Sequence, residues 1–484
     1  AAATDDFPGM IQHVKNYVIN KTNTYLTGGD FEPRVASDRG QQPDTPVLTY
    51  TGDPAYPVNE LSFEHSAFSS PLGRSFVARE WRIAEVTDLS ATNFNPLVPR
   101  NYEITATWES AELTNGVRTI TVPVDDLRVG RNYRVRVRVK DDLGRWSHWS
   151  KPHGFISGEP LNALALVSQI RVTEVMFNPR NGDGLEFVEL QNIGGLPLDL
   201  GGSKFTSGID YVIPTNTVLN SGEYLLVVRA DPAGDFAGFR AAYGLGSEVK
   251  IVGPYDGQLA DGGEDVTLKT ASAGSVIAQF DYNDGRGWPL AADGPGHSMI
   301  PLLIVGTNQA SGALDYPGNW RASTFMFGSP GMTDSNPPLG VVINEMVAHS
   351  DFSNTNFPGY DSNDKVELYN RSTLPVNMEH WYLSDDRDNL VKWAFPALVI
   401  PGSTHAVFDE VSAFHSPLTN GFGLNKDGEE LLLSYLPGNA NDRVVDAFTF
   451  KGQENNIARG RVGDGGAFHD HELNSISNAN LPPL

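Results

Sequence analysis

The segment that decides the fold is TEVMFNPRNGDGLEFVELQNIGGLPLDL, residues 173–200. Two apolar runs flank a turn rich in Gly and Asn, and Asp183, Glu186 and Glu189 lie in the turn or shortly after it. A Gly-rich turn between apolar runs predicts two β-strands of a sandwich. The same carboxylates also suggest a catalytic pair or a calcium site, because both bring several carboxylate oxygens together.

Residues 161–335 and 336–484 repeat each other in six blocks. The pairs are IRVTEVMF with VVINEMVA, EFVELQN with DKVELYN, GLPLDLGGSKFTSG with TLPVNMEHWYLSDD, YVIPTNTVLNSGEYLLVV with WAFPALVIPGSTHAVF, GGEDVTLK with DGEELLLS, and VIAQFDY with VVDAFTF. Six blocks in the same order indicate a duplication. Short, alternating blocks bounded by Gly and Pro predict immunoglobulin-like β-sandwiches. The alignment pairs two sets of glutamates: Glu174 with Glu345, and Glu189 with Glu367.

The composition favours several β-rich domains. A chain of 484 residues has length for about three domains. Its 49 Gly and 32 Pro punctuate apolar runs that are short and alternating, which favours strands and turns over long helices. The sequence has no cysteine, which excludes disulfides, thiolate catalysis and Cys-ligated zinc.

The charge and the apolar runs of the chain argue against nucleic acid partners and membrane spans. The formal charge is −24, whereas proteins that bind DNA or RNA need clustered Lys and Arg, so we expect no nucleic acid partner. No run of about eighteen apolar residues is present, so we expect no membrane span. The chain opens with three alanines and no charged or apolar leader, as a mature or trimmed product would.

Residues 1–30 differ from the rest and predict a helix. Four apolar residues fall near helical spacing: Ile11, Val14, Val18 and Tyr25. Because an isolated amphipathic helix must bury its apolar stripe, we expect the last helix of an upstream domain, or a helix that packs on a neighbouring domain or chain. Residues 31–42 are polar and predict a linker.

Residues 43–160 predict a further β domain. FVAREWRIAEV and NYEITATW alternate like strands, and so does RNYRVRVRVKD. In the last of these, Tyr133 and the valines face one side, while Arg134, Arg136 and Arg138 face the other. DDLGRWSHWSKP follows at once and carries Trp146 and Trp149.

The two repeats resemble the lamin tail domain family. The blocks that carry the resemblance are TEV, EFVELQN and LPLDL in the first repeat, and NEM, KVELYN, LPVNM and WYLSDD in the second. The resemblance implies immunoglobulin-like sandwiches. In bacteria such domains are accessory modules of secreted multidomain surface proteins.

The 43–160 domain resembles a fibronectin type III domain. Tyr133 fits the spacing of a tyrosine corner, in which the hydroxyl bonds back to the upstream backbone. WSHWS is similar to the Trp-Ser-x-Trp-Ser box of cytokine-receptor domains, so the arginines of the facing strand are expected to interleave with Trp146 and Trp149. Stabilisation is the preferred role of this ladder. The alternative is carbohydrate binding by the exposed indoles, which Arg side chains between the rings would block.

The opening helix resembles the C-terminal end of CotH-type protein kinase domains of the spore coat. The resemblance covers some twenty residues. Such kinase domains are often followed by this order of modules in secreted bacterial proteins. The nucleotide-binding and catalytic motifs of the kinase are absent from this sequence, so the resemblance transfers no activity.

The acidic residues have three interpretations. They are Glu174, Asp183, Glu186 and Glu189 in the first repeat, and Glu345, Asp361, Asp364, Glu367, Asp385, Asp386 and Asp388 in the second. One interpretation is a structural calcium site at one end of each sandwich, which makes Ca²⁺ the candidate cofactor. Neither loop has EF-hand spacing and NGDG is an ordinary turn, which favours solvated loops instead. A glycosidase-type pair is disfavoured, because duplicated strand positions indicate a shared requirement of the fold.

The sequence therefore predicts a mainly β, non-catalytic protein of tandem immunoglobulin-like sandwiches: a fibronectin-like domain and two lamin-tail-like domains after one helix. Its expected role is spacing, adhesion or assembly, outside the cell or at a bacterial surface. Expected partners are other surface proteins or further copies of the chain, in a filament or layer. The alternative is an accessory region of a larger secreted kinase or hydrolase that binds carbohydrate or cell wall.

Overall fold

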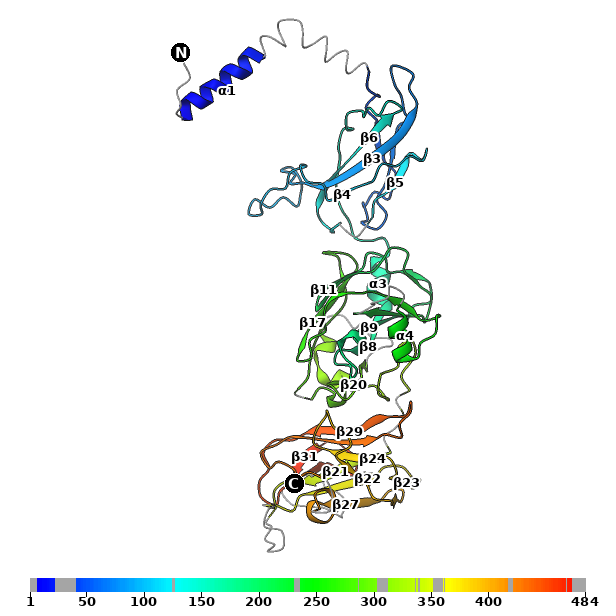
Figure 1. The fold of residues 1–484 in the computed structure, drawn as a ribbon, viewed down its shortest axis with the longest axis vertical. Helices are drawn as coiled ribbons and strands as arrows, with labels where there is room; N and C mark the ends of the chain where they lie inside the picture. Colours follow the sequence, from blue (N-terminus) through cyan, green and yellow to red (C-terminus); the bar gives the residue numbers. More distant parts are fainter. Residues whose placement is uncertain are drawn as a thin grey trace. The chain divides into compact units, whose positions relative to one another are not determined.

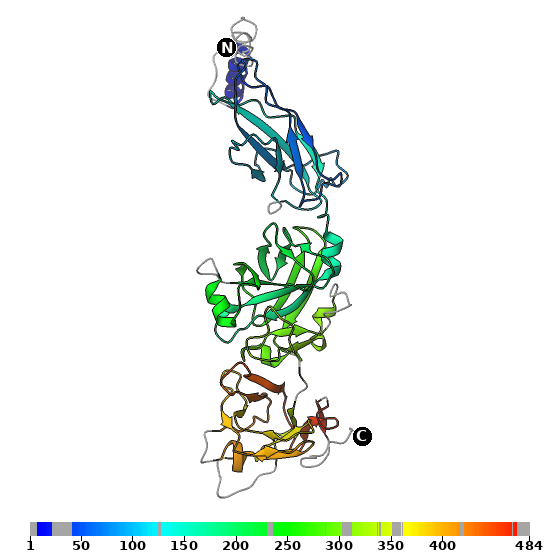
Figure 2. The same ribbon diagram turned by 90° about the vertical axis from the view of Figure 1, so that its right-hand side faces the viewer.

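A computed structural model shows that the chain is mainly β, which confirms the predicted fold class (Figures 1 and 2). Contacts divide it into two compact units, residues 1–161 with 271–274, and residues 162–270 with 275–484. No helix among the described residues is long and apolar enough to cross a membrane. The structure describes residues 7–21, 41–123, 127–229, 236–285, 287–302, 312–335, 337, 340–350, 360, 362–416, 421–466 and 468–471.

The predicted N-terminal helix is present as α1 (Phe7–Lys21). Its apolar residues Ile11, Val14 and Val18 are between 41% and 59% exposed. The rest of the predicted 1–30 segment, including Tyr25, lies outside the described residues, as do residues 31–40 of the predicted linker. The surface on which the helix packs therefore stays a prediction.

The first unit holds a small β-sandwich built on two long strands. One sheet has the order β1-β2-β5 and the other β4-β3-β6-β7. Its core packs Trp81 from β3 against Tyr133 and Val137 from β6. Strict alternation in β6 buries Tyr133 and every second residue after it, as the sequence pattern requires. The strands are β1 (Leu48–Tyr50), β2 (Ser62–His65), β3 (Phe76–Glu85), β4 (Trp108–Glu109), β5 (Thr119–Thr121), β6 (Asn132–Asp141) and β7 (His153–Ile156).

In the second unit, the first repeat is a sandwich of a five-stranded and a six-stranded sheet. The sheet orders are β16-β12-β11-β17-β18 and β15-β14-β9-β8-β19-β20. The elements are α3 (Ala163–Gln169), β8 (Ile170–Met176), η2 (Asp183–Leu185), β9 (Phe187–Asn192), β10 (Leu198–Asp199), β11 (Lys204–Ser207), β12 (Ile209–Val212), β13 (Val218–Leu219), β14 (Tyr224–Val228), α4 (Ala237–Tyr243), β15 (Lys250–Val252), β16 (Asp256–Gly257), β17 (Gly263–Lys269), β18 (Val276–Asn283), η3 (Leu290–Ala292), β19 (Met299–Pro301), η4 (Ala313–Asp315), η5 (Pro317–Asn319) and β20 (Trp320–Ala322).

The second repeat is also a sandwich, with sheets ordered β27-β22-β21-β30-β31 and β25-β24-β28-β29. Each repeat has its own hydrophobic core between its two sheets. The elements are β21 (Val341–Val347), β22 (Lys365–Asn370), β23 (Val376–Asn377), β24 (Trp381–Ser384), β25 (Trp393–Ala394), β26 (Val399–Ile400), β27 (His405–Asp409), η6 (Glu410–Phe414), β28 (Glu430–Tyr435), β29 (Arg443–Thr449), β30 (Ala458–Arg461) and β31 (Phe468–His471).

The two repeats share a register that places their glutamates alike. In the first repeat, β8 pairs with β9 and sets Glu174 opposite Glu189. In the second, β21 pairs with β22 and sets Glu345 opposite Glu367. In both ladders the register shifts just before the pair, as at a β-bulge.

The two repeats also pack on each other within the second unit. A small apolar cluster joins them, with Leu290 and Met326 from the first repeat and Leu432 and Val444 from the second. At its edge, the backbone N–H of Val444 donates to the imidazole Nε2 of His297, at 2.8 Å. Met326 N donates to Asp442 O at 2.9 Å. The first repeat therefore covers the edge strand β29 of the second, which protects backbone groups that an open edge would expose.

Candidate functional site: a carboxylate frame present in both repeats

The pair Glu174 and Glu189 lies beneath a loop of the first repeat. Both side chains are buried, on the sheet face opposite Val175 and Val188, which belong to the core. Glu174 Oε1 accepts hydrogen bonds from Ser298 Oγ (2.6 Å) and Ser329 N (2.9 Å), and its Oε2 accepts one from Ser329 Oγ (3.0 Å). The pair therefore holds the segment that follows β20 against the sheet.

Glu189 completes this arrangement from the facing strand. Its Oε1 accepts a hydrogen bond from Thr173 Oγ1 (2.6 Å) and its Oε2 accepts one from Gly331 N (2.5 Å). Burial raises the pKa of Glu174 to about 7. Burial, and then the neighbouring Glu174, raise the pKa of Glu189 well above its usual value. The pair is thus protonated more readily than exposed glutamates, because burial disfavours the charged form and a second nearby charge adds repulsion.

In the second repeat the glutamates Glu345 and Glu367 lie opposite each other in the same way, but the hydrogen-bond partners differ. Glu367 Oε1 accepts a hydrogen bond from Asn344 Nδ2 at 2.9 Å, and Asn344 takes the place that Thr173 has in the first repeat. The covering loop donates here too, since Gly465 N bonds to Asn344 Oδ1 at 3.0 Å. His405 Nε2 lies 3.9 Å from Glu367 Oε1. In both repeats, then, a side chain of the paired strands accepts a hydrogen bond from a glycine N–H of the covering loop. The acceptor is Glu189 in the first repeat and Asn344 in the second.

A second pair of equivalent acids fixes another loop. Glu186 is buried and accepts from Arg229 Nη1 (2.6 Å), Tyr255 OH (2.9 Å) and Leu259 N (2.8 Å). At the matching place, Asp364 Oδ2 accepts from Leu424 N at 2.6 Å. Leu259 and Leu424 both precede the Gly-Glu strand of their repeat. Each acid therefore ties the start of its strand to that loop.

Two buried asparagines, which the sequence patterns did not single out, complete the frame. Asn192 Nδ2 donates to Leu196 O (2.8 Å) and Leu219 O (2.9 Å), and its Oδ1 accepts from Gly194 N (2.9 Å). Asn370 does the same in the second repeat with Leu374 O, Ile400 O and Ser372 N. Both are fully buried. The signal that would have found them is the Asn that ends both EFVELQN and DKVELYN.

We name these residues the carboxylate frame: Glu174, Glu186, Glu189 and Asn192 in the first repeat, with Glu345, Asp364, Glu367 and Asn370 in the second. The hydrogen-bond partners described above are backbone and side-chain groups of the same repeat, and in each repeat they include backbone N–H groups of loops. The chemistry available to the frame is the fixing of loops on sheets.

The remaining acidic candidates lie apart from the frame. Asp183 is on the surface, 3.2 Å from Arg229. Lys392 Nζ lies 2.6 Å from Asp385 and 3.6 Å from Asp386, and Asp388 is exposed. Asp361 lies outside the described residues. Within the part of the chain that the structure describes, no three His, Asp or Glu side chains form a group that could hold a metal ion.

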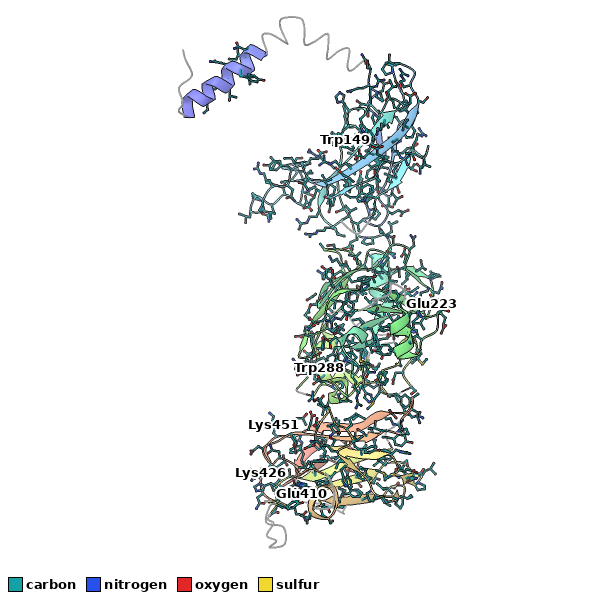
Figure 3. All side chains as sticks on the ribbon, in the orientation of Figure 1. Trp149, Glu223, Trp288, Glu410, Lys426 and Lys451 are labelled. Carbon is teal, nitrogen blue, oxygen red and sulfur yellow. The ribbon has the colours of Figure 1, made fainter. Side chains whose placement is uncertain are left out.

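In the first unit, the Trp-Arg ladder centres on one arginine. Arg138 lies over Trp146 and Trp149, 4.5 Å from each ring centroid, and Lys140 lies 5.1 Å from Trp146. Arg138 Nη2 is also 2.5 Å from Glu80. Figure 3 marks the place of Trp149 in the first unit. Arg138 therefore occupies the space between the two indoles, where a sugar ring would have to stack.

The other residues named for this ladder have different contacts. Arg136 pairs with Glu103 and donates to Ser150 O at 2.8 Å. Arg134 lies 3.7 Å from the same Glu103. The hydroxyl of Tyr133 accepts a hydrogen bond from the backbone N–H of Arg128 at 2.9 Å. This is the upstream backbone bond that a tyrosine corner makes.

Glu189→Gln should stabilise the first repeat at neutral pH by roughly 1–3 kcal/mol, the range for a buried polar group that is left uncompensated, because burial and the neighbouring Glu174 raise the pKa of Glu189 well above its usual value. An acid whose folded-state pKa is raised keeps its proton longer when folded. Its stability contribution is full below pH 4.5 and falls as the pH rises through the folded-state pKa, about 7 for Glu174. Gln removes one ionisable group, and its amide can still pair with Gly331 N and Thr173 Oγ1.

The measurement is urea unfolding of both proteins between pH 4.5 and 8. Glu223→Gln is the control, because Lys250 lowers the pKa of Glu223 to about 2 and its loss should act in the opposite direction. Equal pH dependence of the wild type and Glu189→Gln would contradict the account of the pair.

Part of the chain matches a known protein family. Residues 165–284 match the model described as Lamin Tail Domain. The matched region contains β8, β9 and the first-repeat half of the carboxylate frame. A comparison with curated proteins returns no match.

Solved structures give distant similarities. They include an α-L-rhamnosidase from Dictyoglumus thermophilum (10% identity, TM-score 0.18, 85% of this chain and 46% of that chain). A Streptomyces avermitilis α-L-rhamnosidase complexed with L-rhamnose has 13% identity and a TM-score of 0.18, over 90% and 43%. A 1.5-MDa bacterial ice-binding adhesin has 10% identity and a TM-score of 0.14, over 85% and 98%. The chain spans less than half the length of either rhamnosidase, and at these TM-scores the similarities bear on no function.

Proposed function

We propose that the chain is a non-catalytic structural region of a bacterial surface protein, which spaces, attaches or assembles other parts. The observation that carries the proposal is the carboxylate frame. Its acids and asparagines occupy equivalent places in two sandwiches. In each sandwich part of the set binds backbone N–H groups of loops: Glu174, Glu186, Glu189 and Asn192 in the first, and Asp364 and Asn370 in the second. A duplicated set of buried polar groups that fixes loops is what two copies of one architectural module require.

The domain assignments are part of this proposal. The lamin tail match in the first repeat and the shared register support a second lamin-tail-like domain at residues 336–484. The Tyr133 bond to the backbone and the packing of Arg138 between two tryptophans support a fibronectin type III-like domain. The exposed apolar stripe of α1 is consistent with the end of an upstream, CotH-type domain.

A surface location can be tested on the organism that encodes the chain. Antibodies raised against the purified chain should label intact cells, and external protease should remove the labelling. Labelling that requires lysis of the cells would contradict the extracellular proposal. Both measurements use the wild-type protein, so a folding defect caused by a mutation cannot affect the result.

Assembly with further copies of the chain is the second part of the proposal. Two long edge strands are already covered: Asp281 N on β18 donates to Asp315 Oδ1 (3.0 Å), and Val444 N on β29 donates to His297. Pairing between copies would therefore use another edge, such as β27 in the five-stranded sheet. The sedimentation coefficient of the purified chain should rise with protein concentration, because copies associate. A single monomer species at all concentrations would exclude self-assembly.

The alternative function is an accessory region that delivers a larger enzyme to carbohydrate or cell wall. Arg138 occupies the space between Trp146 and Trp149, so we place the ligand elsewhere, in the cavity between the repeats described below. A glycan-binding screen distinguishes the two functions. Binding lost on substitution of a cavity residue but kept in Trp149→Ala would favour the alternative.

A further inference from the structure

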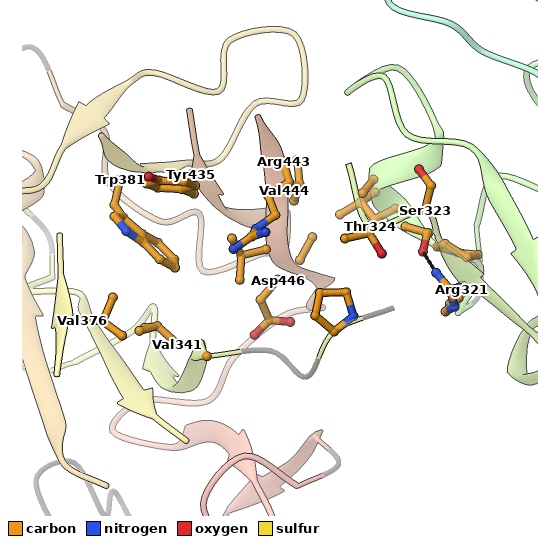
Figure 4. Close-up of a pocket in the computed structure, with 18 of the residues that line it drawn as sticks. Arg321, Ser323, Thr324, Val341, Val376, Trp381, Tyr435, Arg443, Val444 and Asp446 are labelled. Carbon is orange, nitrogen blue, oxygen red and sulfur yellow. Dashed lines mark hydrogen bonds between the residues drawn. The ribbon is translucent and has the colours of Figure 1, made fainter. Parts of the chain in front are cut away.

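A cavity of about 630 Å³ lies between the two repeats of the second unit (Figure 4). The first repeat contributes residues around η3 and the turn after β20, and the second contributes β24, β28 and β29. Its volume is in the range that small-molecule sites have, roughly 300–1,000 Å³. The rings of Trp381 and Tyr435, with centroids 5.4 Å apart, form part of its wall.

Arg443, the first residue of β29, has an uncommon setting in this cavity. Its guanidinium lies 5.5 Å from the ring centroid of Phe325 and 5.6 Å from that of Tyr435. Among the described residues, no carboxylate lies within ion-pair distance of Arg443 and no group accepts a hydrogen bond from its side chain. Burial lowers the pKa of Arg443, but an arginine stays charged at any pH the protein meets.

The other charged residues of the cavity are already paired. Arg321 Nη1 lies 2.7 Å from Asp334 Oδ1. Both oxygens of Asp446 accept from Arg461 Nη2, at 2.9 and 2.8 Å, and Ile343 N donates to Oδ2 at 2.8 Å. Arg443 is thus the one lining charge that the described residues leave uncompensated, in a chain whose formal charge is −24.

The aromatic neighbours of Arg443 decide what it can bind. Rings over a guanidinium interact with its flat faces, whereas its five N–H donors lie in its plane. Those in-plane donors match the two oxygens of a carboxylate or a phosphate, which a guanidinium pairs in a bidentate manner. A partly desolvated cation without an anion is costly, so an oxyanion that enters the cavity relieves that cost.

We propose that this cavity binds a small acidic saccharide, whose oxyanion pairs with Arg443 and whose ring packs on Trp381 in the cavity wall. A pyranose ring presents C–H groups that pack on aromatic rings, and the cavity has room for one or two sugar units. The oxyanion has two chemical sources, a uronic acid carboxylate or a sugar phosphate. The site lies beyond the spacing and adhesion role, which would stand without it.

Isothermal titration calorimetry of the full chain with sodium glucuronate, glucose 6-phosphate and glucose tests the proposal. At least one of the acidic sugars should bind with a Kd of about 1 mM or tighter, whereas glucose should bind at least tenfold more weakly, by about the contribution of one charge-assisted pair. Binding of glucuronate alone identifies a carboxylate ligand, and binding of glucose 6-phosphate alone identifies a phosphate ligand. Absence of binding by both acids at about 10 mM would overturn the proposal.

Substitutions of Arg443 distinguish a residue that binds the acidic ligand from one that only makes structural cation–π contacts. Arg443→Met should weaken acid binding at least about tenfold. Lys451→Gln is the matched control, because Lys451 is exposed in the same repeat (labelled in Figure 3). It is not among the residues that line the cavity, so its loss should leave binding unchanged. Should Arg443→Met unfold, Arg443→Lys keeps the charge and loses the bidentate geometry, and severalfold weaker binding is expected. Unchanged binding in the folded Arg443 variant would show that the residue only joins the repeats.

Discussion

Asn192→Leu should destabilise the first sandwich by about 4 kcal/mol. The substitution keeps the shape of the side chain, but it leaves three backbone groups without their partner: the buried carbonyl of Leu219, and the half-buried carbonyl of Leu196 and N–H of Gly194. Each buried polar group left unpaired costs roughly 1–3 kcal/mol. Asn370→Leu should cost a similar amount in the second sandwich, because Asn370 bonds the equivalent carbonyls of Leu374 and Ile400.

Hydrogen–deuterium exchange in increasing urea measures this effect, because it reports each sandwich separately in a chain of several domains. Gln191→Leu is the matched control on the same strand, since the hydrogen bond from Gln191 to Gly222 O, at 3.2 Å, is exposed. Faster exchange confined to the sandwich that carries the Asn substitution is expected. A cost below about 1 kcal/mol would show that water replaces the asparagine, and would contradict the structural role of the frame.

Acid should weaken the contact between the two repeats, with His297 as the cause. His297 is fully buried, its Nδ1 lies 2.8 Å from Ser323 O, and its Nε2 accepts from Val444 N. Those contacts need the neutral ring with its proton on Nδ1, because a protonated Nε2 has no lone pair for Val444 N–H. Burial lowers the pKa of His297 from 6.5 to about 4. The nearby charged groups are Asp334, which acts against this shift, and Arg443, which adds to it.

The sign of the effect follows from that lowered pKa. As the pH falls below 6.5, the unfolded or separated state takes up a proton first. The stability contribution is therefore full above pH 6.5 and is lost as the pH falls toward 4. The expected loss is about 3 kcal/mol. His297→Gln, which does not titrate, should lack this loss.

Exchange of the Val444 amide between pH 4 and 7, corrected for intrinsic rates, follows the contact directly. In the wild type its protection should fall as the pH drops, and in His297→Gln it should change little. An NMR titration that places the pKa of His297 near 6.5 would contradict this account, as would equal pH profiles of the two proteins.

Much of the fold was predictable because local patterns specify it. Alternation in RNYRVRVRVKD buries one face of β6, and the repeated blocks place two equivalent glutamate pairs at the same register. These features need only neighbouring residues and the period of a strand. The mainly β architecture follows from the same local rules.

The partners of the candidate residues were not predictable, because they come from far along the chain. Glu174 meets Ser298 and Ser329, at separations of 124 and 155 residues. The calcium interpretation requires Glu174, Asp183, Glu186 and Glu189 to converge, whereas the structure separates Glu174 and Glu189 from the Glu186–Arg229 pair that Asp183 flanks. Such contacts depend on how loops cross a sheet, which no strand period encodes.

His297 and Arg443 escaped notice for a related reason. The sequence shows His297 only as the end of the turn DGPGH, and Arg443 as one cation beside a strand. Their settings arise where the two repeats meet, at Val444 and around Phe325. A surface formed by two domains has no signature in either domain alone.

The central claim is that the duplicated carboxylates serve architecture, since buried ones such as Glu174, Glu186 and Asp364 accept hydrogen bonds from groups of the protein. Calcium remains the cofactor that the acidic loops suggest, so thermal unfolding of the chain in 1 mM EDTA and in about 1 mM CaCl2 tests the claim most directly. Calcium bound with a Kd near 10 μM would stabilise the folded chain by about 2.7 kcal/mol and raise a domain's Tm by several degrees. We predict that the Tm values agree within about 1 °C. A rise of about 3 °C or more in calcium would contradict the claim and assign these carboxylates to an ion.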